Sequence, residues 1–467
     1  MGQAESTERL PIDEDNQRYA PFYVPERFTA EEQRLLAPFF SNLDRPVFVI
    51  YNLPEEVIGA LSSRYSRSTK SLRRTFLDEY VLPLREGKAT GGARKGDARA
   101  SPSGVSDQGI WQNQLAEIVD VQRGRKFFDR WLAQYGDDSI AEMGGIHLCL
   151  EGISNIATVE VEDKRIGISP LEKSSRYVSF LDRRDDGEYR YVVPGELRGT
   201  PHERQYRQAM DSLFAAFAEI SEPYLAYLYQ KFPRGEDETE ASFRGSRSAK
   251  RFDDLRDLLP FATQTNLALF GNGRAFEDLI NRLLDHPIGE LRWLGQAITS
   301  ELERVVPSFI RRVRTRRGAD VQIYRAGLRA LREELANAAL GADRPRARSD
   351  SWAELVSATP DADIEVLSAF VFGGAEGIPF DEVRRAVAAM TPEQRADLFQ
   401  RVLAARDVND PSAGRAEVRF RKVPRAFENA RYLFALWARG GDYRDLHRHR
   451  LLTQERQRFT TRLGYDL

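Results

Sequence analysis

The chain has 467 residues, more than one ordinary domain holds, and 41% of them are hydrophobic, which suffices for one or two cores. Its 69 basic and 71 acidic residues nearly cancel, so no overall field favours a nucleic acid or an anionic membrane as partner. The single cysteine, Cys149, excludes intrachain disulfides and a cysteine-rich zinc site, so we expect no metal.

Membrane and secretion signals are not evident in the sequence. No stretch reaches the roughly 18 consecutive apolar residues that a spanning helix needs, and the N-terminus lacks a signal-peptide core. We therefore expect a soluble, cytoplasmic protein.

The first predicted elements indicate that a compact domain begins near Phe28. The pattern predicts a helix near residues 29–40, a strand over 47–51 and a helical run that ends near residue 82. Residues 86–108 are rich in Gly, Ser, Ala and basic residues without periodicity, which indicates a mobile loop.

A dense group of charged and hydroxyl residues follows a predicted strand near 147–151 and a predicted helix over 155–164. Arg165, Glu172, Ser174 and Arg176 fall within a dozen residues. Two guanidinium groups and a hydroxyl suit a phosphate or a uracil-like edge, so the group predicts a nucleotide-type anion site. The alternative is a surface of exposed ion pairs, each of which contributes little.

A second group of polar residues lies beyond a long predicted helix over 203–231 and a predicted polar loop over 235–248. It comprises Arg256, Asn272, Arg274, Arg282 and His286. Arg282 and His286 are four residues apart, which predicts one helix face. Convergence of this group would suit a flavin or a phosphate, whereas the alternative is a capping Asn, surface arginines and a satisfied histidine.

The last part of the chain begins with a predicted linker over 341–352 and helices over 380–390 and 393–405. The run 443–450 is the densest cationic segment and contains Arg448, His449 and Arg450. Two histidines at i and i+2 do not share a helix face, so the run suits a diphosphate better than a metal.

Several of these motifs together resemble the flavin-dependent thymidylate synthases of the ThyX type. That family's signature is R-H-R, a short spacer and E-x-S-x-R-Y, and Glu172–Tyr177 is similar to its second half. Arg282 and His286 resemble its later Arg and His. Other stretches resemble its glycine-to-glutamate lead-in, its arginine ahead of Leu-Pro and its N-x-R flavin element: Gly136–Glu142, Arg256–Pro260 and Asn272–Arg274.

This first signature departs from the family pattern. Asp163 and Lys164 stand where the family has Arg and His, and Met143 stands where it has a histidine. An intact triplet, Arg448–Arg450, lies in a segment that recurs at an offset of about 285 residues, which predicts an internal duplication with a partial second copy.

The resemblance implies reductive methylation of dUMP to dTMP. Methylenetetrahydrofolate would give the carbon, and FAD reduced by NADPH would give the hydride. Arg282 would stabilise an ionised uracil N3 as the catalytic residue. The dUMP-binding residues would be Arg165, Glu172, Ser174, Arg176 and Arg256. The FAD-binding residues would be Asn272, Arg274, His286, Arg448, His449 and Arg450.

The resemblance and the long helices predict an α+β fold. We expect a first ThyX-like domain over 28–340, with a small central sheet flanked by long helices, and a partial second copy over 353–467. The family's subunit-shared sites imply a homo-oligomer. The alternative function is a paralogue that acts on another pyrimidine nucleotide, or a non-catalytic nucleotide- or flavin-binding protein.

Overall fold

The structure is a computed structural model that describes residues 14–85, 140–163, 166–184, 186–341, 352–404 and 421–460. The predicted loop over 86–108 lies outside these ranges. The chain forms two compact units, one of Met1–Arg344 with Gly440–Phe459, the other of Pro345–Arg439 with Thr460–Leu467. Residues 440–459 are therefore grouped with the first unit. The predicted assignment of 353–467 to a second repeat stays a prediction.

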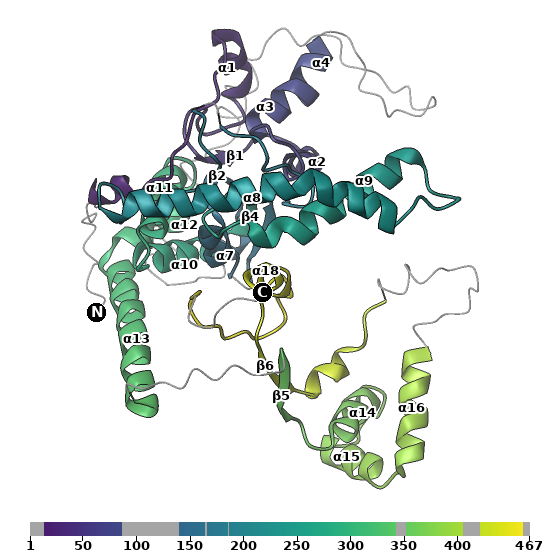
Figure 1. Ribbon diagram of the computed structural model, residues 1–467. Helices are drawn as coiled ribbons and strands as arrows, with labels where there is room; N and C mark the ends of the chain where they lie inside the picture. The colour runs from purple at the N-terminus through teal and green to yellow at the C-terminus, as the bar shows by residue number, and fades with distance from the viewer. Residues whose placement is uncertain are drawn as a thin grey trace. The chain divides into compact units, whose positions relative to one another are not determined.

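The first unit is built on a four-stranded antiparallel sheet in the order β1-β2-β4-β3 (Figure 1). Val47 and Val49 of β1 pack on one face and Phe48 and Ile50 on the other, as the period of two in a strand requires. This sheet among helices confirms the α+β fold. The strands are β1 (Val47–Ile50), β2 (Gly145–Ser154), β3 (Ile168–Glu172) and β4 (Gln264–Asn272).

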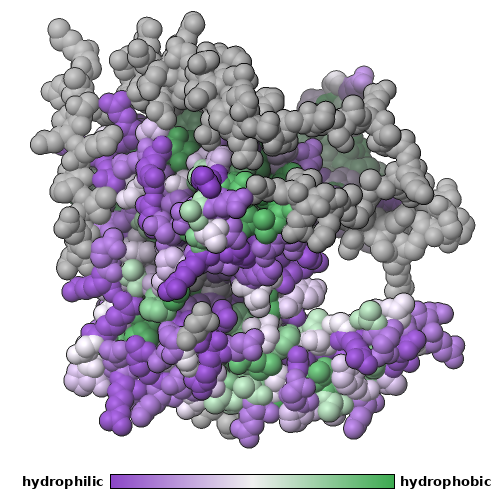
Figure 2. All heavy atoms as spheres, turned by 90° about the horizontal axis from the view of Figure 1, so that it is seen from above, coloured by the Kyte–Doolittle hydropathy of each residue, from purple (hydrophilic) through white to green (hydrophobic). Residues whose placement is uncertain are grey.

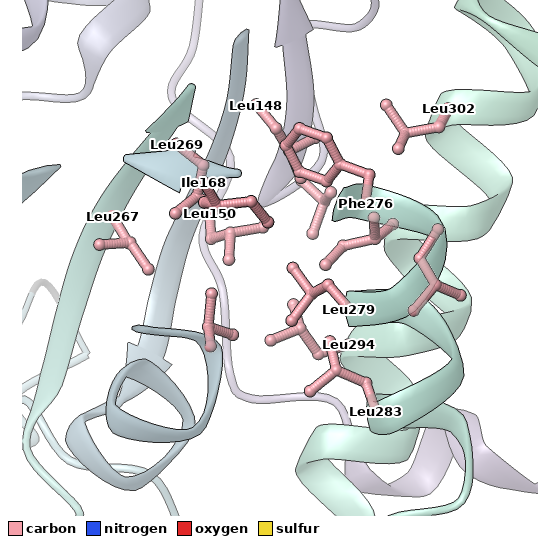
Figure 3. Close-up of a cluster of buried hydrophobic side chains, with 14 of the residues drawn as sticks. Leu148, Leu150, Ile168, Leu267, Leu269, Phe276, Leu279, Leu283, Leu294 and Leu302 are labelled. Atoms are coloured by element: carbon pink, nitrogen blue, oxygen red, sulfur yellow. The ribbon is translucent and has the colours of Figure 1, made fainter. Parts of the chain in front are cut away.

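One face of the sheet packs against two helices, α10 (Gly273–Leu284) and α11 (Gly289–Val305). Figure 3 shows Leu148, Leu150, Leu267 and Leu269 directed from the strands toward the leucines of these helices and Phe276. Burial of this many aliphatic side chains supplies much of the driving force for folding.

The opposite face of the sheet packs against the N-terminal helices. The sequence pattern predicted helices in this region, near residues 29–40 and in a run ending near residue 82. Phe48, Cys149 and Ala268 lie in this second core. The elements are α1 (Ala30–Leu36), α2 (Glu55–Tyr65), α3 (Leu72–Phe76), a π-helical turn η2 (Leu77–Val81) and α4 (Leu82–Arg85).

A hairpin of two long helices carries a third core. The predicted helix over 203–231 is confirmed as α8 (His202–Lys231), but the predicted polar loop over 235–248 is wrong because α9 covers Glu240–Leu255. Thr239 caps α9 by accepting a hydrogen bond from the Ser242 amide, and Phe252 packs into the core. Because the apolar face of α9 is narrow, the segment reads as mostly polar and its helical period was not recognised in the sequence.

The junction from β2 into α7 (Asn155–Glu162) is fixed by a buried carboxylate. Ser154 caps α7 through the Ala157 amide. Glu290 accepts hydrogen bonds from the Ser154 amide at 2.8 Å and from its hydroxyl at 2.6 Å. Burial raises the pKa of Glu290. The predicted helix over 155–164 is thereby confirmed as far as Glu162.

Shorter elements and one long helix complete the first unit. These elements are η1 (Glu14–Tyr19), η4 (Ile140–Met143), η5 (Arg256–Leu258), α12 (Pro307–Ile310), η6 (Arg311–Arg314), α13 (Arg316–Leu340) and α18 (Gly440–Leu446). Before β3, Gly167 has a φ of 89°, a left-handed value that favours glycine.

In its described residues, the second unit pairs two strands and packs three helices. Val366, Leu367, Val383 and Val387 are its buried apolar residues. Its helices near 380–390 and 393–405 were predicted, and both predictions are confirmed. The elements are β5 (Ala353–Ala358), α14 (Ala362–Phe372), α15 (Phe380–Ala388), α16 (Pro392–Ala404), η7 (Arg425–Asn429) and β6 (Tyr432–Leu436).

The surface carries mixed polarity. Figure 2 shows hydrophilic residues over most of the coloured part of the face in view, with hydrophobic residues in scattered patches. Among the helices that the structure describes, none combines the length and the apolar character needed to cross a membrane.

Candidate nucleotide site

The predicted site residues meet at the end of β3, where α18 packs against the first unit. Glu172 ends β3, and its carboxylate is almost fully buried. It accepts a hydrogen bond from Arg444 Nη2 at 2.5 Å and from Arg448 Nη2 at 2.8 Å. Two guanidinium groups thus neutralise one carboxylate, which is the condition for burying it.

Two further arginines, Arg176 and Arg256, share a pair of carboxylates. Asp445 Oδ2 accepts from Arg256 Nη2 at 2.8 Å and from Arg176 Nη2 at 3.1 Å. Asp253 Oδ1 accepts from Arg176 Nε at 2.7 Å and lies 3.3 Å from Arg256 Nη1. The two guanidinium groups therefore converge on one oxygen of Asp445, which is how arginines bind a phosphate or carboxylate.

Ser174 shapes the turn that carries Arg176. Its backbone amide donates to the Ser66 carbonyl at 2.8 Å, and its hydroxyl oxygen accepts from the Arg176 amide at 3.3 Å. Of the predicted dUMP residues, Glu172, Ser174, Arg176 and Arg256 are thus brought to one place. Arg165, with its neighbour Lys164, lies outside the described residues.

The helix α18 is anchored by a buried acid–base pair. His447 Nε2 lies 2.7 Å from Glu162 Oε2, and both side chains are nearly inaccessible. Burial alone would lower the pKa of His447, but the hydrogen bond and the charge of Glu162 outweigh it, so that pKa is raised. Tyr443 also donates to Asp163 Oδ1 at 3.3 Å.

The predicted flavin residues of the first copy lie at the other end of β4. Asn272 caps α10, its Oδ1 accepting from the Ala275 amide at 2.8 Å. Arg274 is exposed and its Nη1 lies 2.7 Å from Glu142 Oε1. Met143, at the family's histidine position, is 86% exposed.

The triplet Arg448–Arg450 reaches β3 at both ends. Arg448 binds Glu172 at its end, and Arg450 Nη1 donates to the Ile168 carbonyl at its start, at 3.0 Å. Ile168 pairs with Gly271, the residue before Asn272, so Arg450 is brought next to the strand that carries Asn272. His449 is exposed.

Arg282 and His286 pack against α7. Arg282 Nη2 donates to the Val161 carbonyl at 3.4 Å, and burial lowers its pKa. His286 lies 3.7 Å from Glu160; burial, with the nearby Arg329 and other arginines, lowers its pKa to about 4. Because α10 ends at Leu284, the predicted shared helix face is wrong. Pro287 follows His286 and disfavours helical backbone there.

Arg282 therefore contacts other residues than the predicted dUMP-binding arginines do. Arg282 contacts α7, whereas Arg176 and Arg256 share partners in α9 and α18. Arg456 joins the α7 side, contacting Glu160 and, at 2.9 Å, Asp163. The Asp163 departure from the family pattern thus has an arginine partner within the chain.

Sequence reasoning missed three residues of this site, Arg444, Asp445 and Lys173. Arg444 and Asp445 lie inside the cationic run 443–450, but nothing in that run indicated that an acid would bind the arginines. Within the described ranges, no group of three or more His, Cys, Asp or Glu residues could hold a metal ion.

The chain is similar to several known proteins. The profile of the family described as "Thymidylate synthase complementing protein" matches residues 96–308. A protein of Chlamydia muridarum named UPF0159 protein is 35% identical over 443 residues, which are 94% of this chain and 77% of the relative. A flavin-dependent thymidylate synthase of Mycobacterium sp. (strain JLS) is 30% identical over 198 residues, 42% of this chain and 69% of the relative.

Among the similar solved structures is the flavin-dependent thymidylate synthase ThyX from Helicobacter pylori complexed with FAD and dUMP. It is 16% identical and covers 44% of this chain and 91% of its own, with a TM-score of 0.30. A score that low says nothing about individual residues.

Proposed function

Because this chain belongs to the ThyX-type family of flavin-dependent thymidylate synthases, we propose that it converts dUMP to dTMP by reductive methylation. The carbon would come from methylenetetrahydrofolate and the reducing equivalents from NADPH. We also propose that the protein is cytoplasmic and forms a homo-oligomer.

The observation that carries the proposal is the convergence of Arg176 and Arg256 on one carboxylate oxygen of Asp445. A nucleotide phosphate presents the same kind of oxygen with more charge. It would take the place of the Asp445 carboxylate and accept from both guanidinium groups, as charge-assisted bonds favour. Asp253, on α9, would hold both arginines in position.

The remaining substrate residues would orient the nucleotide. Glu172 is buried between Arg444 and Arg448 and holds both guanidinium groups in place. Ser174 holds the turn of Arg176, and its hydroxyl can donate to the ligand. Arg165 belongs to the same proposed group by its place in the signature.

The donor set at the start of β3 fits a flavin diphosphate. Arg274 and His449 are exposed hydrogen-bond donors, and Arg450 reaches the strand next to Asn272. Arg448 and His286 complete the proposed FAD group. Bound FAD would supply the hydride; these side chains would hold its phosphates and orient its ring.

Catalysis by this route needs no enzyme thiolate. Cys149 is buried in the sheet, and desolvation raises its pKa, so its thiol stays protonated. The protein's contribution would be positioning and polarisation of the uracil ring. We assign the polarising role to Arg282, which the resemblance implies.

A second candidate is a nucleotide-binding protein that acts on another pyrimidine nucleotide or on none. It is favoured by Asp163 and Met143, which replace family residues, and by the ion pair of Asp163 with Arg456. In that case the nucleotide would still bind between Arg176 and Arg256.

Three measurements test the proposal. The purified protein should show flavin absorbance, and its gene should rescue a thymidine auxotroph. Arg176→Ala should lower dUMP affinity by about 10- to 100-fold, because charge-assisted hydrogen bonds are lost. Arg244→Ala, on the exposed side of α9 and paired with Glu240, is the matched control. Failed rescue by well-expressed, flavin-loaded protein would leave only the second candidate, and unchanged dUMP affinity in Arg176→Ala would refute the site.

A further inference from the structure

A small cavity is lined in part by Arg256 and Arg444. It measures about 10 Å³, the space that one water molecule or one ligand oxygen occupies. Its polar lining comprises Lys173, Asn155, Ser175, Arg256, Thr263, Thr265 and Arg444.

The polar atoms of this cavity are short of partners. The oxygens Asn155 Oδ1, Thr263 Oγ1 and Thr265 Oγ1 are buried without a hydrogen bond. Buried polar atoms of folded proteins are nearly always satisfied. The two threonine hydroxyls call for an acceptor or a water, whereas Asn155 Oδ1 only accepts and does not argue for an anion. Hydroxyls of Thr263 and Thr265 can both donate to an incoming oxygen.

Lys173 adds a buried positive charge. Its residue is only 7% exposed, and among the described residues its ammonium has no hydrogen-bond or ion-pair partner. The Tyr65 ring of α2 lies 5.7 Å away. The Glu151 carboxylate acts on this ammonium, but its oxygens accept hydrogen bonds from Tyr23, Tyr65 and the Leu72 amide. The cavity brings Lys173 together with two guanidinium groups, which makes an anionic oxygen the expected occupant.

We propose that Lys173 is a further nucleotide-binding residue. Its ammonium, together with Arg256 and Arg444, takes one oxygen of the substrate phosphate into this cavity. The inference rests on the proposed function, because it needs dUMP to bind between Arg176 and Arg256. It adds a contact at a position that the E-x-S-x-R-Y pattern leaves open.

The charges around Lys173 make this contact dependent on pH. Burial lowers the pKa of Lys173 to about 8. Glu151 of β2 raises this pKa, and Arg190 lowers it. Arg256 and Arg444 face the same cavity. The phosphate has its second pKa near 6, so its own charge is constant above pH 7. Affinity for dUMP should therefore fall as the pH rises through about 8, where Lys173 loses its proton.

The test compares dUMP binding by titration calorimetry in the wild type and in Lys173→Met, which keeps the length and removes the charge. We expect the variant to bind about 10- to 100-fold more weakly at pH near 7. Its affinity should also stay flat between about pH 7 and about pH 9. Binding of deoxyuridine, which lacks the phosphate, should not change.

Two control variants separate the possible failures. Lys250→Met removes an exposed lysine that pairs with Asp254 and should behave as wild type. If the wild type does not bind dUMP, the proposed function fails and Lys173 with it. If the wild type binds, Arg176→Ala does not, and Lys173→Met matches the wild type, the cavity holds only water and this inference alone is overturned.

Two remaining outcomes are also decisive. An equal loss of deoxyuridine binding in Lys173→Met would overturn the phosphate assignment. If Lys173→Met does not fold, the pH profile of the wild type decides, because an affinity that is flat through pH 8 contradicts a titrating lysine at the phosphate.

Discussion

Arg176 and Arg256 are held by two carboxylates that differ in how firmly each is placed. Asp253 belongs to α9, a helix of 16 residues packed in a core, whereas Asp445 lies near the end of the seven-residue α18. Nearby arginines hold the pKa of Asp445 below its usual range although burial acts against this, so it is ionised at neutral pH. A phosphate would displace Asp445 more easily than Asp253.

Asp445→Asn should therefore raise the affinity for dUMP. The amide oxygen still accepts a hydrogen bond but no longer competes as an anion, and a half-exposed ion pair gives a gain on the order of 3-fold. Fluorescence or calorimetric titration with dUMP measures it. Asp254→Asn, on the same helix turn as Asp253, is the control. A lower affinity would mean that Asp445 orders the arginines for the nucleotide.

At this scale the sequence predicted part of the site. The signature grouped Glu172, Ser174, Arg176 and Arg256, and the structure brings these four together. Lys173 and Asp445 were missed for a physical reason: one occupies a variable position of the signature and the other is an acid in a cationic run. Their importance comes from burial and pairing across about 270 residues of chain, which local pattern does not encode.

Helix α18 is the element on which the site depends, and its main buried contact is the pair of His447 with Glu162. The raised pKa of His447 means that the pair stabilises the fold fully below the unfolded pKa of about 6.5. This contribution is lost as the pH rises through the raised folded-state pKa.

His447→Gln should lower the melting temperature most at acidic pH. A hydrogen bond to a charged group contributes about 1.5–3 kcal/mol, and the difference from wild type should shrink as the pH rises. Calorimetry or circular dichroism at several pH values measures it. His202→Gln, at the exposed start of α8, is the control. A His447 effect that is constant with pH would contradict the ion pair.

Other elements show what periodicity can and cannot reveal. The strand β1 was predicted from a short continuous run of apolar residues, and α8 from apolar residues at helical spacing; α15 and α16 were also predicted as helical segments. The strand β4 was not predicted: Gln264, Asn266 and Gly271 interrupt its apolar run. Its pairing with β2 and β3 on both edges stabilises it nonetheless.

At the scale of the whole molecule, the element order recurs at the predicted offset of about 285 residues. The strand β6 lies 285 positions after residues 147–151 of β2, and α18 begins 285 positions after α7. Each repeat pairs its strand with an antiparallel partner, β1 or β5. His447 and Glu162, which pair, are also 285 positions apart; Glu162 ends α7 and His447 directly follows α18. This recurrence supports the duplication, which stays a prediction.

The long helix α13 offers a surface for the proposed homo-oligomer (Figure 1). Tyr324, Leu328, Leu331 and Leu335 are exposed and follow at intervals of four, three and four residues. This spacing forms the seam of paired helices in coiled coils. An exposed seam of this kind is typical of an interface.

Replacing Leu328 and Leu331 together by Glu should lower the oligomer mass. Two charges in the seam would be buried without partners, which costs several kcal/mol by order of magnitude. Light scattering coupled to size exclusion measures the mass. Ala330→Glu, exposed and outside the seam, is the control. A wild type that is monomeric, or a double variant of unchanged mass, would contradict this interface.

Asp445 and the two arginines belong to one covalent chain, and this affects how the arginines change partner. The helix α18, which carries Asp445, is grouped with the first unit, which also contains Arg176 and Arg256. Asp445 therefore acts as an intramolecular competitor whose local concentration does not depend on the protein concentration. A nucleotide must outcompete this fixed local concentration, whereas the same residues supplied as a separate peptide would be diluted away. Asp445 thus sets a threshold in nucleotide concentration below which Arg176 and Arg256 keep their internal anion.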